Sequence, residues 1–343
     1  MFVIKLKKET LAISAICLCC IVVVFGCLGH FFRVGAQENK QFIKYAEFNA
    51  TYEAMEKAMR EDIKSHSSEI KISWIEILAY LAAKYGGNFK CYKESDMNEI
   101  IAKLKSGISM QELTKNVKNY GYYYEVYSAV LKEFLGEYKI KRKMPQNGGE
   151  SEWETAYGLK AFSPIAKTFP FSHFDDFGAA RSYGYSRPHL GHDMMAATGT
   201  PVVAVESGTV EIMGWNQYGG WRVGIRSFDK KRYYYYAHLR QNRPFHIDLK
   251  EGKVVKAGDV IGYVGRTGYS TKENVNNIDK SHLHWGMELV FDESQKECDN
   301  EIWINLYAIT KLLEKNKSAV VRNNDTKEFY PDFEFSEANL EQN

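Results

Sequence analysis

The sequence predicts an α+β fold in which an N-terminal apolar helix is followed by a helical domain and then by an antiparallel β-sheet domain. Three observations predict this order. An uncharged apolar run occupies residues 11–32, helical periodicity continues to about residue 140, and short β-rich runs with glycine-containing turns fill residues 155–292. A chain of 343 residues has room for two domains.

The apolar run at residues 11–32 is long enough to cross the hydrocarbon core of a bilayer as one helix. Three lysines precede it, so we expect the N-terminus to stay in the cytoplasm and the chain beyond about residue 35 to lie outside. On this interpretation residues 1–34 are a cytoplasmic stub and a transmembrane anchor. The protein is then a single-pass protein of the cell membrane, and most of the chain is extracytoplasmic.

Two other interpretations of the N-terminus remain open. The Val-Gly-Ala before Gln37 resembles a signal-peptide cleavage site, which would give a cleaved and secreted protein. Lipid attachment at Cys27 is the second alternative, although Phe25 fits that motif poorly. All three interpretations export the rest of the chain.

Residues 40–140 have the pattern of a helical extracytoplasmic domain. Apolar residues at steps of three and four within 42–65 indicate an amphipathic helix. Ser73 with Glu76, and Ser109 with Glu112, have the spacing of capping boxes that begin further helices. This region could contact other envelope proteins.

The composition changes after the helical domain. Residues 141–155 contain proline, a Gly-Gly pair and mixed charges, which are typical of a linker. Residues 156–316 carry the β-rich runs, with a helical pattern near 301–315, and predict the antiparallel β-domain. Residues 317–343 are expected to be a polar and loose C-terminal tail.

The bulk composition excludes some classes of function. Apolar residues make up 45% of the chain and charged residues 26%, as in ordinary globular proteins. The net charge is only +2, so nothing indicates a nucleic-acid partner. Four of the six cysteines lie in the apolar run, which excludes a disulfide framework and a cysteine-based zinc site.

Histidines gather in three separate segments of the β-domain. His189, His192 and Asp193 lie within five residues, His238 follows a run of tyrosines, and a later strand contains His282-Leu283-His284. Residues two apart in a strand point to the same face, so the last two imidazoles should lie side by side. Such a pair could simply form hydrogen bonds. However, imidazole and carboxylate are zinc ligands, and a catalytic zinc needs three of them and one open position.

These motifs resemble those of the lysostaphin/LytM-type zinc metallo-endopeptidases, which cut peptidoglycan peptides. That family has His-x-x-x-Asp, then a histidine in a Tyr-x-His-Leu-like strand, then His-x-His. The chain contains the same three motifs in this order, as His189 to Asp193, Tyr236-Ala237-His238-Leu239 and His282-Leu283-His284. The resemblance covers about residues 165–292.

The resemblance implies a role for each motif residue. His189, Asp193 and His284 would bind one zinc ion per chain, and His238 and His282 would be the catalytic pair beside it. A histidine in this position can take or give a proton near neutral pH. Which of the two acts as base and which stabilises the oxyanion stays open.

Three further residues complete the predicted site. His192 lies where the family usually has an apolar residue, and we expect it to pack nearby, the alternative being that it replaces His189 as a ligand. Tyr234 and Tyr236 alternate with His238 along the strand, so they would share its face and could contact substrate.

The resemblance predicts a peptidoglycan hydrolase that cleaves stem or cross-bridge peptides, with zinc as cofactor and with peptidoglycan and the cell membrane as partners. The alternative is a non-catalytic LytM-like scaffold or activator in an envelope complex. Such degenerate members lose metal ligands, whereas all five predicted positions are present here.

Overall fold

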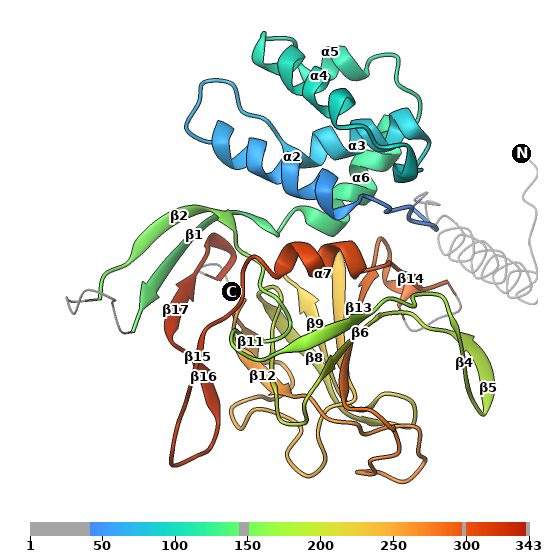
Figure 1. Cartoon of the computed structure of the whole chain (residues 1–343), viewed down its shortest axis with the longest axis vertical. Helices are drawn as coiled ribbons and strands as arrows, with labels where there is room; N and C mark the ends of the chain where they lie inside the picture. Colours follow the sequence, from blue (N-terminus) through green and yellow to red (C-terminus); the bar gives the residue numbers. More distant parts are fainter. Residues whose placement is uncertain (1–41, 144–150, 297–299, 341–343) are drawn as a thin grey trace, which may run out of the picture. The chain divides into compact units, whose positions relative to one another are not determined.

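The computed structural model describes residues 42–143, 151–296 and 300–340 (Figure 1). The contacts divide the chain after Ile43, and Lys44–Asn343 form one compact unit that holds both the helices and the sheets. The predicted limits of a separate helical domain and a peptidase domain therefore stay predictions. In the described part of the chain, no helix has the length and apolarity needed to span a membrane. The anchor predicted at residues 11–32 lies outside the described residues.

Six α-helices occur in the described residues, five of them before the first strand. They are α2 (Tyr52–Ser65), α3 (Trp74–Tyr85), α4 (Glu94–Lys105), α5 (Met110–Thr114), α6 (Tyr120–Leu131) and α7 (Tyr307–Leu313). Single 3-10 turns are found at Phe89–Cys91, Glu293–Gln295 and Ala338–Leu340. The helix expected from residue 42 begins ten residues later, because Thr51 caps it by accepting a hydrogen bond from the Ala54 amide.

Both capping serines predicted from the sequence are confirmed. The Ser73 hydroxyl accepts a hydrogen bond from the Glu76 amide at the start of α3, and the Ser109 hydroxyl accepts one from Glu112 at the start of α5. Helix α3 ends at Gly86, whose φ of 57° is the left-handed conformation that glycine adopts easily. Local sequence therefore determines where these helices begin and end.

The main sheet has eight antiparallel strands and carries the candidate site. Its order is β11-β8-β9-β10-β13-β6-β3, and β14 pairs with β13. The strands are β3 (Phe171–Phe174), β6 (His192–Ala196), β8 (Gly208–Asn216), β9 (Gly220–Ser227), β10 (Arg232–Ala237), β11 (Val254–Val255), β13 (His282–Leu289) and β14 (Ile302–Trp303). Apolar side chains of β8, β9, β10 and β13, such as Val210, Ile225 and Leu283, are almost fully buried.

Smaller strand groups surround this sheet. The strands β7 (Pro201–Val203) and β12 (Val260–Tyr263) pair with each other, as do β15 (Val320–Arg322) and β16 (Phe329–Pro331). The hairpin of β4 (Ala180–Tyr183) and β5 (Tyr185–Pro188) projects from the sheet (Figure 1). A third group has the order β17-β1-β2, formed by β1 (Leu135–Arg142), β2 (Glu154–Leu159) and β17 (Phe333–Ser336).

The C-terminal segment differs from the polar tail expected for residues 317–343. Strand β17 pairs with β1, and Phe333 and Phe335 are buried against Phe162. Burial of these rings outweighs the polar composition around them. The predicted linker at 141–155 also differs, since its two ends belong to the paired strands β1 and β2.

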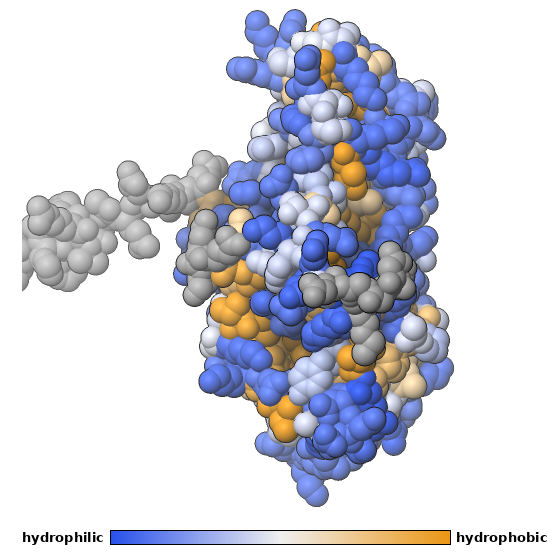
Figure 2. Space-filling model, turned by 90° about the vertical axis from the view of Figure 1, so that its left-hand side faces the viewer, coloured by the Kyte–Doolittle hydropathy of each residue, from blue (hydrophilic) through white to orange (hydrophobic). Residues whose placement is uncertain are grey.

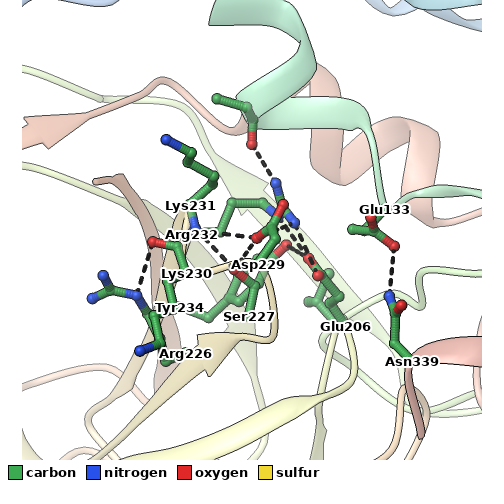
Figure 3. Close-up of polar contacts among 12 residues, drawn as sticks. Glu133, Glu206, Arg226, Ser227, Asp229, Lys230, Lys231, Arg232, Tyr234 and Asn339 are labelled. Carbon is green, nitrogen blue, oxygen red and sulfur yellow. Dashed lines mark hydrogen bonds and ion pairs between the residues drawn. The ribbon is translucent and has the colours of Figure 1, made fainter. Parts of the chain in front are cut away.

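Two polar clusters join the helices to the sheets. The Arg232 guanidinium donates from Nη1 to the Ala129 carbonyl of α6 at 2.5 Å, and it also binds Glu206 (Figure 3). The Lys160 ammonium binds Glu133 after α6 and Glu337 after β17, at 3.0 and 2.6 Å. The last helix, α7, lies against α2. These contacts fix the helices on the β-rich part of the same unit.

Hydrophilic residues dominate the face drawn in Figure 2, and hydrophobic residues form small separate groups on it. Isolated apolar residues are normal on a protein surface.

Candidate metal centre and active site

The central strand β13 brings the predicted ligands together. Its neighbours are β6 and β10, and His284 is paired with Asp193 on one side and with Ala237 on the other. Side chains directly opposite in an antiparallel pair are close neighbours on one face. His189 comes from the turn just before β6 and approaches the same face. The fold thus joins motifs that are almost a hundred residues apart.

The three predicted ligands form a compact triangle of donor atoms. His189 Nε2 lies 2.9 Å from His284 Nδ1 and 3.1 Å from Asp193 Oδ1, and His284 Nδ1 lies 3.0 Å from Asp193 Oδ1. Among the residues that the structure describes, this is the group suited to hold a metal ion. Four-coordinate zinc with bonds of about 2.1 Å separates its ligand atoms by about 3.4 Å. The donor types and their spacing therefore fit zinc.

A second carboxylate supports His189 from behind. Asp176 Oδ1 lies 2.8 Å from His189 Nδ1, the ring nitrogen that faces away from the triangle. Carboxylates in this position orient a ligating imidazole and fix its tautomer. Arg181 binds the other oxygen of Asp176 and lies 3.5 Å from Asp193 Oδ2. Sequence reasoning missed Asp176, because it lies in a loop with no motif spacing to the ligands.

The neighbouring histidines keep the Asp193 carboxyl ionised. Burial by itself would raise the pKa of this carboxyl, but hydrogen bonds with His189 and His284 outweigh it and hold the pKa well below its usual range. Asp193 is therefore a carboxylate at any working pH, as a metal ligand must be.

The two predicted catalytic histidines, His238 and His282, have the same tautomer when they are neutral. His238 Nδ1 lies 2.9 Å from the Thr267 carbonyl, and His282 Nδ1 lies 2.8 Å from the Lys280 carbonyl. A carbonyl only accepts hydrogen bonds, so the neutral rings carry their protons on Nδ1 and leave Nε2 free of a proton. The ring centroid of His238 is 4.8 Å from that of His282 and 5.7 Å from that of His284.

A glycine makes room for the third ligand. A Cβ atom on Gly191 would lie 2.4 Å from the His284 ring, and also 2.9 Å from the carbonyl oxygen of Trp285. Real Cβ atoms do not approach so closely, so the turn between His189 and Asp193 requires glycine here.

Comparisons with known proteins agree with this geometry. Residues 187–297 match the family model described as Peptidase family M23. These matched residues, which resemble the M23 peptidases, are called the M23 domain. The resemblance to lysostaphin/LytM-type peptidases is confirmed.

Individual relatives match part of the chain. The L-Ala–D-Glu endopeptidase of Bacillus subtilis (strain 168) is 40% identical over 130 residues, which are 38% of this chain and 38% of the relative. Lysostaphin of Staphylococcus simulans is 38% identical over 89 residues, or 26% of this chain and 17% of lysostaphin. The chain thus spans well under half the length of these relatives.

One solved structure can be aligned with more of the chain than the M23 domain. A crystal structure of a protein named lytM from Ruminococcus gnavus ATCC 29149 covers 77% of this chain and 88% of its own, with 24% identity and a TM-score of 0.49.

His192 lies in the M23 domain but faces away from the donor triangle. Its Nε2 lies 2.8 Å from His173 Nδ1, and His173 Nε2 lies 2.8 Å from Glu314 Oε1. Burial and the neighbouring His173 lower the pKa of His192 to about 3, so the ring is neutral. The structure thus places His192 in a polar chain that leads to the residues after α7, as a packed residue beside the ligands.

The two tyrosines predicted to contact substrate do not line the cleft, and this is a correction. Tyr234 is fully buried and donates to Glu206 at 2.5 Å, while the equally buried Tyr236 accepts from the Val205 amide. The alternation fails at His238, whose φ is 60°, outside the extended range of β10. His238 therefore turns to the opposite face from Tyr234 and Tyr236.

The cleft over the donor triangle has a volume of about 670 Å³. Tyr233 and Tyr235, which lie on the opposite face of β10 from Tyr234 and Tyr236, line the cleft together with Tyr218 and Tyr269. Three arginines also line the cleft, namely Arg181, Arg187 and Arg222. Sequence reasoning missed these residues, because only the sheet pairing shows which side chains share the face of His284.

Proposed function

We propose that this chain is a zinc metallo-endopeptidase that cleaves peptide bonds in the peptides of peptidoglycan. The observation that carries the proposal is the His189, Asp193 and His284 triangle, with its atoms 2.9 to 3.1 Å apart at the base of a cleft. The relatives named L-Ala–D-Glu endopeptidase and lysostaphin support the same reaction and substrate class. These three residues would hold the zinc ion.

Bound zinc would supply Lewis-acid polarisation of the scissile carbonyl. The remaining chemistry belongs to His238 and His282. Since each Nδ1–H is donated to a backbone carbonyl, each Nε2 can exchange a proton with the reacting groups in the cleft. Asp193 stays ionised, and Asp176 Oδ1 lies 2.8 Å from His189 Nδ1, where a carboxylate can orient the ring.

Purified peptidoglycan tests this proposal. The full-length chain, supplied with zinc, should release soluble fragments whose masses identify the cleaved peptide bond. A chelator should stop the release, and zinc added in excess of the chelator should restore it. Intact peptidoglycan after prolonged digestion, with one zinc ion bound per chain, would instead favour the non-catalytic scaffold.

We also propose that residues 11–32 anchor the protein in the cell membrane, with the M23 domain outside. The lysines before this apolar run and its length support the orientation. Protease added to wall-stripped intact cells should degrade the M23 domain. Complete protection of the domain would contradict the orientation, and recovery of the protein from the medium would favour cleavage.

A further inference from the structure

Two arginines of the cleft lack the carboxylate partner that three other arginines of the protein have. Arg181, Arg226 and Arg232 each bind a carboxylate at hydrogen-bond distance. No carboxylate of the described residues lies within 4.0 Å of the guanidinium groups of Arg187 and Arg222. Both of these line the cleft above the donor triangle. Neither arginine therefore forms an ion pair within the described part of the chain.

Aromatic rings hold these two guanidinium groups in place. The Arg187 guanidinium carbon lies 4.6 Å from the ring centre of Tyr218 and 5.3 Å from that of Tyr269. The Arg222 carbon lies 6.0 Å from the ring centre of Tyr235. Stacking on an aromatic face orients a guanidinium but leaves its charge and its N–H edge available.

The same rings connect the arginines to the site histidines. The Tyr269 ring centre is 6.0 Å from that of His238, and the Tyr235 ring centre is 5.9 Å from that of His284. Each arginine is thus separated from a site histidine by one aromatic ring. Burial raises the pKa of Tyr235 to about 12, although Arg222 and Arg187 oppose this. Both cations are therefore near the same hydroxyl.

Each guanidinium also has a buried nitrogen without a hydrogen-bond partner among the described residues. These atoms are Arg187 Nη1 and Arg222 Nε. A buried donor that finds no acceptor is costly, so such atoms call for an acceptor from a ligand. A carboxylate is the acceptor that a guanidinium binds best, through two parallel hydrogen bonds.

The acidic groups of the cleft do not fill this role. Asp193 is bound to His189 and His284, and Glu301 accepts a hydrogen bond from the Trp303 indole at 2.6 Å. The third acidic residue of the cleft, Glu288, forms no ion pair with Arg187 or Arg222. The acceptor must then arrive with the substrate.

We propose that Arg187 and Arg222 bind a free carboxylate of the substrate peptide beside the scissile bond, so that the cleft selects acidic peptides over neutral ones. This inference rests on the proposed peptidase function and names the substrate feature that the same site recognises.

Two peptides that differ in one group test the inference. Both contain an L-alanyl-γ-D-glutamyl-L-lysine unit, and the D-glutamate α-carboxyl is free in one and an amide in the other. Full-length protein with zinc should cleave the acidic peptide with a kcat/KM about 10- to 100-fold higher, as expected for a charge-assisted hydrogen bond. In Arg222→Gln and Arg187→Gln this ratio should fall towards one, and Arg222→Lys should keep part of it.

Arg60→Gln is the matched control, because it removes an equal charge from an exposed position on α2. It should keep the full ratio. Zinc content and thermal unfolding midpoint establish that each variant is folded. If the wild-type protein cleaves both peptides equally, or if both cleft variants keep the ratio, the inference is overturned while the proposed function stands. If the wild-type protein cleaves neither peptide nor peptidoglycan, the proposed function itself fails.

Discussion

Strand β10 has a buried polar cluster at each end, and the two clusters differ in how their groups are paired. At its start, Arg232 is fully buried and binds Glu206, Asp229 and the Ala129 carbonyl (Figure 3). Beyond its end, His238 faces the cleft. There the predicted metal-ligand atoms lie close to one another and border the open volume of the cleft. The first cluster is satisfied within the chain, and the second is arranged for a ligand.

The two clusters therefore show two different roles of buried polar groups. Burial raises the pKa of Glu206 although Arg232 opposes it, so the carboxylate depends on its partner. In the cleft, Asp193 has two histidine partners and its pKa is held low. Removing a group from the first cluster should therefore cost stability, and removing one from the second should cost metal or activity.

The largest effect is expected from the two histidines of β13. His284→Ala should purify with far less zinc and no activity, because it removes a predicted ligand. His282→Ala should keep near-stoichiometric zinc but lose roughly a hundredfold or more in turnover, as expected for the loss of a proton-transfer group. Elemental analysis and digestion rates of both variants test this. His66→Ala, at the end of α2, should change neither.

The opposite zinc contents in these two variants would invert the assigned roles. Full zinc and full activity in both variants would refute the metallopeptidase proposal.

The second effect concerns stability and the other end of β10. Arg232→Met leaves Glu206 buried without its cation, so we expect a loss of about 5 kcal/mol in the free energy of unfolding, at the upper end for a broken buried pair. Zinc per folded chain should be unchanged. The double variant with Glu206→Gln should be more stable than Arg232→Met alone, because the orphaned charge is gone. Urea unfolding measures all three, and a loss below about 1 kcal/mol would contradict the interpretation.

The resemblance implied the ligand set, and each of the motifs that carry the resemblance is local in the sequence. His189 and Asp193 are four residues apart, and His282 and His284 are two apart on one strand face. The motif order carried the resemblance, which the family comparison bears out. Helix starts at Ser73 and Ser109 were predictable for the same reason, since a cap is a local hydrogen bond.

The rest depended on contacts between distant residues or on one backbone angle. The positive φ of His238 reverses the face of the tyrosine strand, and no alternation rule predicts it. Asp176 reaches His189 from a loop. Strand β17 pairs with β1 across almost two hundred residues, although the alternating Phe333 and Phe335 were a local signal that could have indicated a strand.

A third and smaller effect tests the paired cluster at Lys160. Burial would lower the pKa of this ammonium, but Glu337 and Glu133 raise it above its ordinary value. Because the folded pKa is raised, the ammonium stabilises the fold fully below about pH 10.5, and this contribution is lost as the pH rises through the folded pKa. Lys160→Met should thus cost about 3 kcal/mol at pH 8, and the deficit should shrink at pH 11. A deficit that is equal at both pH values would contradict the charge argument.

The smallest effect on activity is expected from His192, although it is adjacent to a predicted ligand. Its ring lies on the face of β6 opposite Asp193 and is paired with His173, which binds Glu314. His192→Ala should therefore keep its zinc and most of its activity, while His173 Nδ1, left without its partner, costs about 1–3 kcal/mol of stability. His189→Ala is the matched variant and should lose both zinc and activity. Zinc content, digestion rate and urea unfolding of the two variants distinguish a ligand from a packed neighbour. If His192→Ala loses its zinc and His189→Ala keeps it, then the metal site uses the other face of β6. The cluster arranged for a ligand would then be the one that contains His173 and Glu314.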